Sequence, residues 1–464
     1  MMNHRFPMLI LSAAVLAACS MAPTYERPAA PVAGQWQQAG SGATQAADTG
    51  WHEFFADAQL RSVIELALAN NRDLRIAAAN VDKARAQYGV QRAAQLPSVN
   101  ATAGENATRT PAALSTTGQD RVSRQYSAGV GIPNWELDFF GRVESLKQQA
   151  LAQYLATEEA QASARMSLIG EVANVWLTLA ADRERLQFSQ ATLAAQRESL
   201  TLAQRRYEVG TASGLDLAQA RSVVESARVE TARYAAQVEQ DINALTLLVG
   251  GAVPAEHLPK ALPERVSTLA ELPAGLPAET LLRRPDVRAA EQQLIAANAS
   301  IGAARAAFFP RISLTASTGF ASPALENLFQ GEARTWSFAP QISLPIFSGG
   351  ANRANLEAAQ ASQRAQLAQY EKTLQSAFRD VADALAQRAT LGEQLDAQQA
   401  LTAANAQALK LSQARYDKGV SAYLAVLDAQ RSHFAAQQAL IGTRLSRELN
   451  RVALYKQLGG GLKD

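Results

Sequence analysis

The nine residues ISLTASTGF, numbered 312 to 320, alternate between two kinds of side chain. Apolar residues stand at positions 312, 314, 316 and 320, and small or polar residues stand at 313, 315, 317 and 319. Successive side chains of a strand point to opposite faces, so the pattern predicts a strand with one apolar and one polar face. This is typical of a transmembrane β-barrel strand, although taken alone it fits the half-buried hairpin of a soluble sheet better.

The same alternation recurs in three other places. Strands are expected at 98–110, 122–137, 312–322 and 334–345. Pro340 and Pro345 are awkward in the last of these, because proline cannot donate to a strand ladder. Membrane barrels begin at about eight strands and leave no open edge in lipid, so four strands per chain require several chains. Three chains would supply about twelve strands and enclose a channel.

Two proline-free segments, 142–209 and 351–418, predict very long helices. At about 1.5 Å per residue each would reach about 100 Å, which a monomeric globule cannot bury. Gly210 and Gly419 are expected to end these helices, because glycine readily adopts the left-handed conformation that closes a helix. The chain is then expected to return as two further helices, 215–249 and 424–458.

The chain contains an internal duplication. A shift of 213 residues superposes 72–103 on 285–316, and a shift of 209 superposes Tyr207-x-x-Gly210 on Tyr416-x-x-Gly419. Two repeats follow, 62–249 and 278–458, each with a first helix (62–96 or 278–309), two strands, a long helix and a returning helix. A proline-rich linker, 250–277, separates the repeats, and a tail, 459–464, ends the chain.

The amino terminus predicts export and lipidation. Residues 1–18 are typical of a secretory signal peptide, and Cys19 is the single cysteine of the chain, so it cannot form an internal disulfide. The string Leu16-Ala17-Ala18-Cys19 resembles a bacterial lipobox, which implies a diacylglyceryl thioether and an acylated new amino terminus. Ser20 then favours the outer membrane, and 19–61 is expected to be a lipidated, extended segment. The alternative is a free cysteine beside a signal peptide.

Several function classes are disfavoured by composition. The chain has 44 Lys and Arg against 42 Asp and Glu, so the basic excess of a nucleic-acid-binding protein is missing. Its four histidines stand apart, and it has neither a phosphate loop nor a nucleophile elbow. Asp380 and Asp383 lie at helical spacing in a long amphipathic segment, which indicates a helix edge rather than an acid–base pair. We therefore expect no enzyme and no bound cofactor or metal.

A set of short strings indicates the family. They are Leu16-Ala-Ala-Cys19, Trp135-Glu-Leu-Asp-Phe-Phe-Gly-Arg142, Arg283-Arg-Pro-Asp-Val-Arg288, Phe309-Pro-Arg-Ile312, Leu344-Pro-Ile-Phe347, Arg415-Tyr-x-x-Gly-Val420 and Leu427-Asp-Ala-Gln-Arg431. With them, the mature chain resembles the TolC-type outer-membrane efflux proteins, in the lipoprotein branch typified by OprM, over essentially its whole length.

The resemblance implies a mixed α/β membrane protein built mainly of long helices. It implies a homotrimer in the outer membrane, in which four strands per chain make a 12-stranded barrel, above a periplasmic helical barrel. It also implies docking, through a periplasmic adaptor, to an inner-membrane efflux pump, with no cofactor. The implied function is the outer-membrane channel of a tripartite drug efflux system for antibiotics, detergents and other toxic compounds.

The resemblance also implies a gate at the periplasmic tip of the helices. Arg415, Tyr416 and Asp428 match a gating arginine, tyrosine and aspartate ring, and Asp216 matches the acidic partner in the first repeat. Where some members carry a second aspartate, this chain has Ala425, so a single ring is expected. The alternative is that these charged residues are ordinary solvated helix edges.

Two other functions remain open. The channel could be the exit duct of a type I protein secretion system, and the type of pump encoded beside it would discriminate between the two. The chain could instead be a lipid-anchored, trimeric coiled-coil structural protein, which predicts sustained heptads without duplicated strand pairs. The duplicated strand pairs argue against that alternative.

Overall fold

The structure is a computed structural model of the 464-residue chain, and it describes residues 21–34, 36, 49–267 and 278–461. The predicted signal peptide and Cys19 lie outside the described residues. The chain divides into two compact units, which we describe separately. The first contains 80–158 and 289–371, and the second contains 30–79, 159–288 and 372–464.

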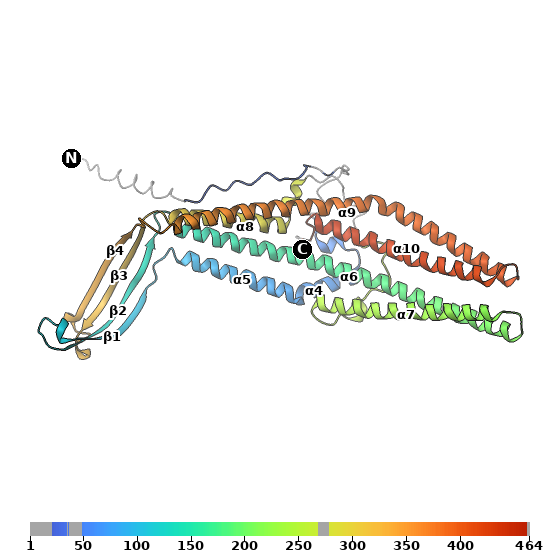
Figure 1. Cartoon of the computed structure of the whole chain (residues 1–464), viewed down its shortest axis with the longest axis horizontal. Coiled ribbons are helices and arrows are strands. Elements are labelled where there is room, and N and C mark those ends of the chain that lie inside the picture. The colour runs from blue at the N-terminus through green and yellow to red at the C-terminus, as the bar shows by residue number, and fades with distance from the viewer. Residues whose placement is uncertain (1–20, 35, 37–48, 268–277, 462–464) are drawn as a thin grey trace. The chain divides into compact units, whose positions relative to one another are not determined.

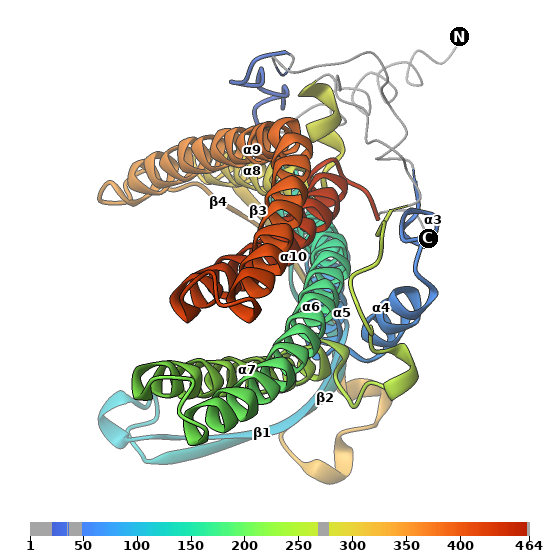
Figure 2. The same cartoon turned by 90° about the vertical axis from the view of Figure 1, so that its right-hand side faces the viewer.

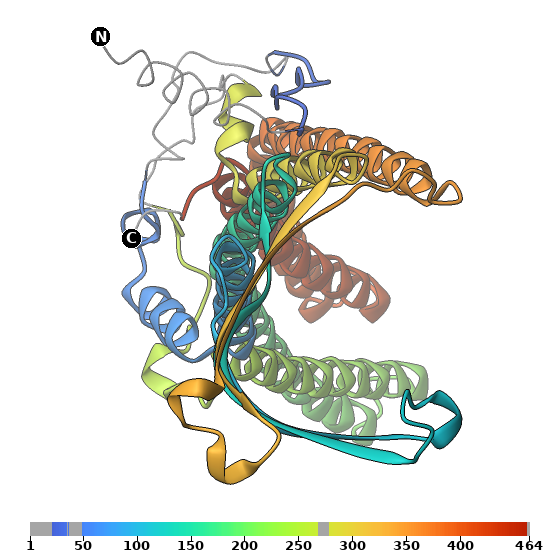
Figure 3. The same ribbon diagram turned by 90° about the vertical axis from the view of Figure 1, so that its left-hand side faces the viewer.

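The first unit contains one antiparallel four-stranded sheet in the order β1-β2-β3-β4 (Figure 1). Its strands are β1 (Asn100–Thr110), β2 (Arg121–Leu137), β3 (Arg311–Ser322) and β4 (Arg334–Ser343). The loops between β1 and β2 and between β3 and β4 lie at the same end of the sheet (Figure 1), and they stand apart from each other across its width (Figure 3). The helices join the strands at the other end (Figure 1).

The strand register sorts the side chains into two faces. One cross-strand row contains Ala101, Val130, Thr318 and Trp336, and the next row on the same side contains Ala103, Ala128, Phe320 and Arg334. Rows on the other side are small or polar, such as Thr102, Gly129, Gly319 and Thr335. We call the two sides the apolar face and the polar face. The alternation seen in the sequence therefore holds across all four strands.

A pair of opposed glycines brings β2 and β3 close together on the polar face. A Cβ atom added to Gly319 would lie 2.3 Å from the backbone oxygen of Ala128, and one added to Gly129 would lie 2.8 Å from that of Thr318. Any larger residue would force the strands apart. Pro340 lies in β4 and pairs with Leu314 of β3. Because β4 is an edge strand of the chain's own sheet, it tolerates a proline. Pro345 lies beyond the end of β4.

The second unit contains two helical hairpins (Figures 1 and 2). The long helices α6 (Arg142–Glu208) and α9 (Ala351–Asp417) have 67 residues each, and only their later parts belong to this unit. They return as α7 (Gly214–Val249) and α10 (Tyr423–Gln457). No helix in the described residues has enough length and apolar character to cross a membrane.

Both long helices end in the same backbone motif. The N–H of Gly210 bonds to the oxygen of Tyr207 at 3.0 Å, and the N–H of Thr211 bonds to that of Arg206 at 2.8 Å. Gly419 and Val420 repeat this pattern in the second hairpin, at 2.9 Å each. The two glycines have φ values of 77° and 74°, which glycine adopts without strain. Each long helix thus ends in a Schellman motif, which the local sequence specifies through its glycine.

Three expected elements need correction. The helix expected at 62–96 is two helices, α4 (Ala58–Asn70) and α5 (Arg72–Ala93). Asn71 separates them, because its side chain accepts from the N–H of Leu74 and donates to the oxygen of Leu248 in α7. The segment expected to be extended to residue 61 instead contains α3 (Trp51–Phe54) and the start of α4, which Asp57 caps.

The start of the second repeat also differs from the expected helix at 278–309. The structure has a short 3₁₀ helix, η3 (Ala278–Arg283), followed by α8 (Pro285–Ala306). Arg284 lies at the break, where it binds Asp286 at 2.7 Å and the backbone oxygen of Gln457 at 3.0 Å. Pro285 then occupies the first helical position, where its missing N–H costs nothing.

The segment 21–29 is held against α8 in the first unit. Arg27 forms an ion pair with Glu291 at 2.7 Å, and Asn298 donates to the backbone oxygen of Pro23 at 2.7 Å. Arg305, in the last turn of α8, donates to the oxygen of Met21 at 3.2 Å. The chain that follows Cys19 is therefore fixed close to the point where α8 passes into β3.

Candidate functional site

The two hairpin turns lie at the same end of the second unit (Figures 1 and 2). The four predicted gate residues all lie at these turns. Asp216 is in the first turn of α7, Arg415 and Tyr416 are in the last turn of α9, and Asp428 is in the second turn of α10. The structure therefore places at one end of the unit residues that are 200 positions apart in sequence.

The α6–α7 turn is closed by its own side chains. Ser213 accepts a hydrogen bond from the N–H of Asp216 at 3.1 Å, and the Asp216 carboxylate accepts one from the N–H of Ser213 at 3.1 Å. This reciprocal pair is a capping box, which satisfies two backbone donors at the start of α7. Asp216 is thus first of all the cap of its own helix.

The α9–α10 turn lacks such a cap. Ala422 stands at the N-cap of α10 and offers no side-chain acceptor. Arg415 instead donates from Nε to the Oγ of Ser421 across the turn, at 2.9 Å. A charged donor therefore holds this turn, where a capping box holds the other.

An aromatic pair joins the two ends of the second turn and meets the first hairpin. The rings of Tyr416 and Tyr423 lie 5.1 Å apart, and Tyr423 is buried with 5 % of its surface exposed. The guanidinium of Arg206 in α6 lies 5.1 Å from the centre of the Tyr416 ring and 3.9 Å from the carboxylate of Asp417. Burial raises the pKa of Tyr423, and the nearby Tyr416 and Asp216 raise it further. Tyr423 therefore lies between residues of both hairpins.

A small hydrophobic cluster supports these turns. Its buried members are Ala203, Ala220, Tyr423, Val426 and Leu427. They come from α6, α7 and α10, so the two hairpins pack against each other just behind the turns. This packing fixes the directions in which the polar tip residues can point.

The remaining predicted gate residue, Asp428, faces solvent. Its carboxylate lies 3.9 Å from Arg431, one turn further along α10, and both side chains are about two-thirds exposed. Within the chain no pair forms between Arg415 and Asp216, because each has a partner in its own turn. Among the described residues, no group of three or more His, Cys, Asp or Glu side chains could hold a metal ion.

Sequence reasoning missed five residues of this site, which are Arg206, Ser213, Ser421, Tyr423 and Arg431. The spacing Ser213-x-x-Asp216 is a capping-box pattern, and Asp428-x-x-Arg431 is a helical ion-pair spacing, so both signals were readable. The roles of Arg206 and Tyr423 had no local signal, because their partners belong to other helices.

The sheet supplies the second functional feature. Its apolar and polar faces match the lipid and lumen faces of a membrane barrel strand, and both of its outer strands leave an unpaired edge. Aromatic residues gather where the strands join the helices, and Phe140 and Phe309 stack there at 5.1 Å. Such aromatic residues mark the interface of a membrane barrel. Together with the helical hairpins, these features define a multichain outer-membrane channel.

The chain belongs to the outer membrane efflux protein family. The family described as "Outer membrane efflux protein" matches residues 63–251 and 276–460, which are the two repeats. The antibiotic efflux pump outer membrane protein ArpC of Pseudomonas putida and the toluene efflux pump outer membrane protein TtgC of Pseudomonas putida are similar to it. Each is 49% identical over 459 residues, which is 98% of this chain and 95% of the relative.

Solved structures agree with this assignment. The open state of the MtrE outer membrane channel of Neisseria gonorrhoeae has a TM-score of 0.86 and 41% identity, and covers 96% of this chain and 99% of that one. The predicted fold class is confirmed: a mainly helical chain whose four strands are one chain's share of a trimeric TolC-type barrel. The protein is a channel of the outer membrane whose helices extend into the periplasm.

Proposed function

We propose that this chain forms the outer-membrane duct of a tripartite efflux assembly that exports small organic molecules, with antibiotics and aromatic solvents among them. The observation that carries the proposal is 49% identity, over 98% of the chain, to relatives named for antibiotic and toluene efflux. A periplasmic adaptor and an inner-membrane pump are the partners. The duct itself needs no energy source, because the pump supplies the driving force.

The hairpin turns form the gate of this duct. In a trimer, three copies of Asp428 converge on the axis at the periplasmic tip, and such an acidic ring favours cations over anions. Its exposure and the long 3.9 Å separation from Arg431 leave each carboxylate available to the passage. Arg415 holds the neighbouring turn closed through Ser421, and Tyr416 holds it through Tyr423. For the gate to open, the second hairpin must therefore either break these contacts or move as a unit that keeps them.

The proposed site of the lipid anchor is Cys19. Met21, two residues further on, is bound by Arg305 in the last turn of α8, near the start of β3. A thioether-linked lipid at Cys19 would then enter the membrane beside the helix end of the strands. Cys19→Ser should abolish incorporation of radioactive palmitate, and undiminished labelling would remove the anchor from the proposal.

Conductance in planar lipid bilayers tests the gate. Arg415→Ala should raise single-channel conductance, because a hydrogen bond from a charged donor contributes about 1.5–3 kcal/mol to the closed turn. Ser421→Ala removes the same bond from its other end and should act in the same direction. Asp428→Asn should leave the conductance nearer to wild type and reduce the preference for cations.

The matched control is Arg228→Ala. Arg228 is an exposed arginine of α7 whose partner, Glu225, lies 2.9 Å away on the same helix. Its removal should change neither conductance nor selectivity. If the Arg415, Ser421 and Asp428 variants all behave like this control, the turns are solvated helix edges and the gate lies elsewhere.

A further inference from the structure

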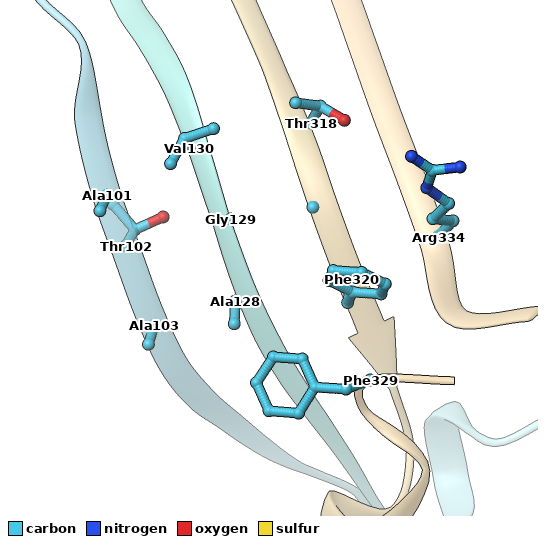
Figure 4. Close-up of a pocket in the computed structure, with 11 residues that line it drawn as sticks. Ala101, Thr102, Ala103, Ala128, Gly129, Val130, Thr318, Phe320, Phe329 and Arg334 are labelled. Atoms are coloured by element: carbon cyan, nitrogen blue, oxygen red, sulfur yellow. The ribbon is translucent and has the colours of Figure 1, made fainter. Parts of the chain in front are cut away.

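The apolar face of the sheet contains a hollow near its loop end (Figure 4). Its volume is about 590 Å³, within the range of about 300–1,000 Å³ that small-ligand sites occupy. Small side chains form its floor, and two phenylalanines and an arginine stand around it. These residues are Ala101, Ala103, Ala128, Val130, Phe320, Phe329 and Arg334.

The floor and wall come from different parts of the unit. The alanines on β1 and β2 have short side chains, so they form the floor of the hollow. Phe320 on β3 lies in the same cross-strand row as Ala128 and forms part of the wall. Phe329 comes from the β3–β4 loop, and its ring lies 5.6 Å from that of Phe320 in an edge-on arrangement. Phe329 is nevertheless 73% exposed, so a large aromatic side chain is offered to the surroundings rather than buried. The hollow therefore suits an apolar chain lying along the sheet.

Arg334 gives the hollow a positive rim. It starts β4 and lies opposite Phe320 in the apolar row. The two other arginines on the apolar face are both paired, Arg109 with Asp120 at 2.5 Å and Arg124 with Glu105 at 3.9 Å. Among the described residues, no ion pair or side-chain hydrogen bond involves the guanidinium of Arg334. A charge beside an apolar membrane surface is favourable only with a counter-ion, and none comes from the part of the chain that the structure describes.

The position of Arg334 in the membrane indicates which kind of molecule would bind in the hollow. The strands join the helices at one end and carry the loops at the other (Figure 1), so in a channel whose helices extend into the periplasm the loop end of the sheet faces the exterior. Arg334 begins β4 directly after the loop, so it stands at the end of that strand that faces the outer leaflet, while β1 and β2 continue beyond its row to the pair Thr110 and Arg121. The anionic lipid of that leaflet is a phosphorylated glycolipid with several acyl chains. Guanidinium binds phosphate in a bidentate manner, and basic pockets on membrane proteins bind lipid headgroups.

We propose that this hollow binds one lipopolysaccharide molecule of the outer leaflet, with a lipid phosphate on Arg334 and an acyl chain over the alanine floor. This inference rests on the outer-membrane location of the protein and not on the compounds that it exports. The bound lipid would cover the exposed Phe329 and supply the counter-ion that Arg334 lacks. It would thereby complete the apolar face at the exterior end of each chain.

Native mass spectrometry of the purified, delipidated trimer tests this with bis-phosphorylated, hexa-acyl lipid A as the probe. The wild type should bind one added lipid A per chain, and should bind dephosphorylated lipid A and phosphatidylglycerol more weakly. Arg334→Gln should lower lipid A affinity about tenfold or more, as expected for losing a hydrogen bond from a charged donor. Ala103→Phe, which fills the floor and leaves the charge in place, should also lower it.

The control is Arg121→Gln, because Arg121 is an exposed arginine at the same end of the sheet but on the polar face. Unchanged lipid A binding by Arg334→Gln and Ala103→Phe, or equal binding of phosphatidylglycerol, would overturn the proposal. A less stable Arg334→Gln trimer with unchanged lipid A per chain would also overturn it, since Arg334 would then pair with a neighbouring copy. Single-channel conductance of the same samples separates this result from any failure of the channel function.

Discussion

The turns of the first and second hairpins have the same backbone motif, but different side-chain contacts stabilise them. At a shift of 209 residues, Ser213 corresponds to Ala422, and Asp216 corresponds to Ala425. The first turn therefore has a capping box, and the second has lost both of its members. The second turn depends instead on Arg415, Tyr416 and Tyr423 and on contacts with Arg206 of the other hairpin.

This difference shows which part of the tip can move. A capping box satisfies backbone groups within four residues, so these two hydrogen bonds of the first turn do not depend on a neighbouring helix. The contacts of the second turn reach between helices, so they can be exchanged when neighbouring helices shift. We expect the second hairpin to open and the first to act as the fixed frame. The following experiments test that expectation, beginning with the largest effect.

Removing the buried aromatic side chain should loosen the second turn most. Tyr423→Ala should cost about 3–5 kcal/mol of local stability, as other large aromatic truncations in packed sites do. Hydrogen exchange should accelerate strongly over residues 415–427 and remain unchanged over 205–217. Leu424→Ala is the control, because Leu424 is the adjacent residue and is 52% exposed. Equal acceleration in both turns would show that the hairpins open together.

The bodies of the hairpins differ in charge at another matched position. Asp241 of α7 corresponds to Asn450 of α10, and both are buried. Asn450 donates to the backbone oxygen of Ala384 at 2.9 Å. The pKa of Asp241 is raised from 3.8 to about 6, chiefly by burial and also by the neighbouring Asp182, while Gln237 and Arg185 oppose the rise. The first hairpin therefore contains a titrating group that the second lacks.

This group should make stability depend on pH. The folded chain holds the Asp241 proton more tightly than the unfolded chain, so the free energy of unfolding should fall as the pH rises from about 4 to about 6. Asp241→Asn should remove this fall and stabilise the protein at pH 7.5 by about 1–3 kcal/mol. Melting temperatures in detergent at pH 4.5 and 7.5 measure this effect, with Asp383→Asn as the control, because the side chain of Asp383 is 72% exposed on its helix. A variant that melts with the wild-type pH dependence would contradict this account.

Breaking the capping box should have a smaller effect. Ser213→Ala should cost about 1 kcal/mol and accelerate hydrogen exchange only in the first turn of α7. Ser213→Thr keeps a hydroxyl acceptor and should largely preserve the cap. If Ser213→Ala also speeds exchange in residues 415–427, the first turn is not an independent frame.

Transplanting the capping box into the second turn should have the smallest effect. Ala422→Ser combined with Ala425→Asp recreates the pattern of the first hairpin and should stabilise the second turn by up to about 1 kcal/mol. We expect slower hydrogen exchange there and fewer channel openings in planar bilayers. Ala425→Asp alone, which adds the charge without the cap, is the control. More frequent openings in the double variant would show that the missing cap does not set the mobility of this turn.

Much of the fold was readable from local pattern. The expected strands agree with the observed ones to within two residues at each end, and the long helices to within one residue. Three local features predicted these elements: the alternation of side chains, the absence of proline, and the glycines at 210 and 419. Each acts over a few residues, so it can be recognised in the sequence. The break at Asn71 was missed because its side chain is bound by the end of α7, which is remote in sequence.

The candidate site was only half readable. Its members Asp216, Arg415, Tyr416 and Asp428 came from the family resemblance, and their places at the hairpin turns came with the helix boundaries. Their partners did not follow from it. The resemblance implies Asp216 as the acidic partner of the gate, but it gave no hint that Arg415 binds Ser421 and that Asp216 caps its own helix.

The sequence by itself therefore determined the elements, their duplication, the two-faced strands and the turn motifs, because each depends on backbone preferences within a few residues. The tertiary structure alone decided which helices meet at Tyr423, where Arg206 points, and which arginine of the apolar face stays unpaired. Those outcomes depend on distances between segments up to about two hundred residues apart, and side-chain pairing follows distance in space rather than distance along the chain.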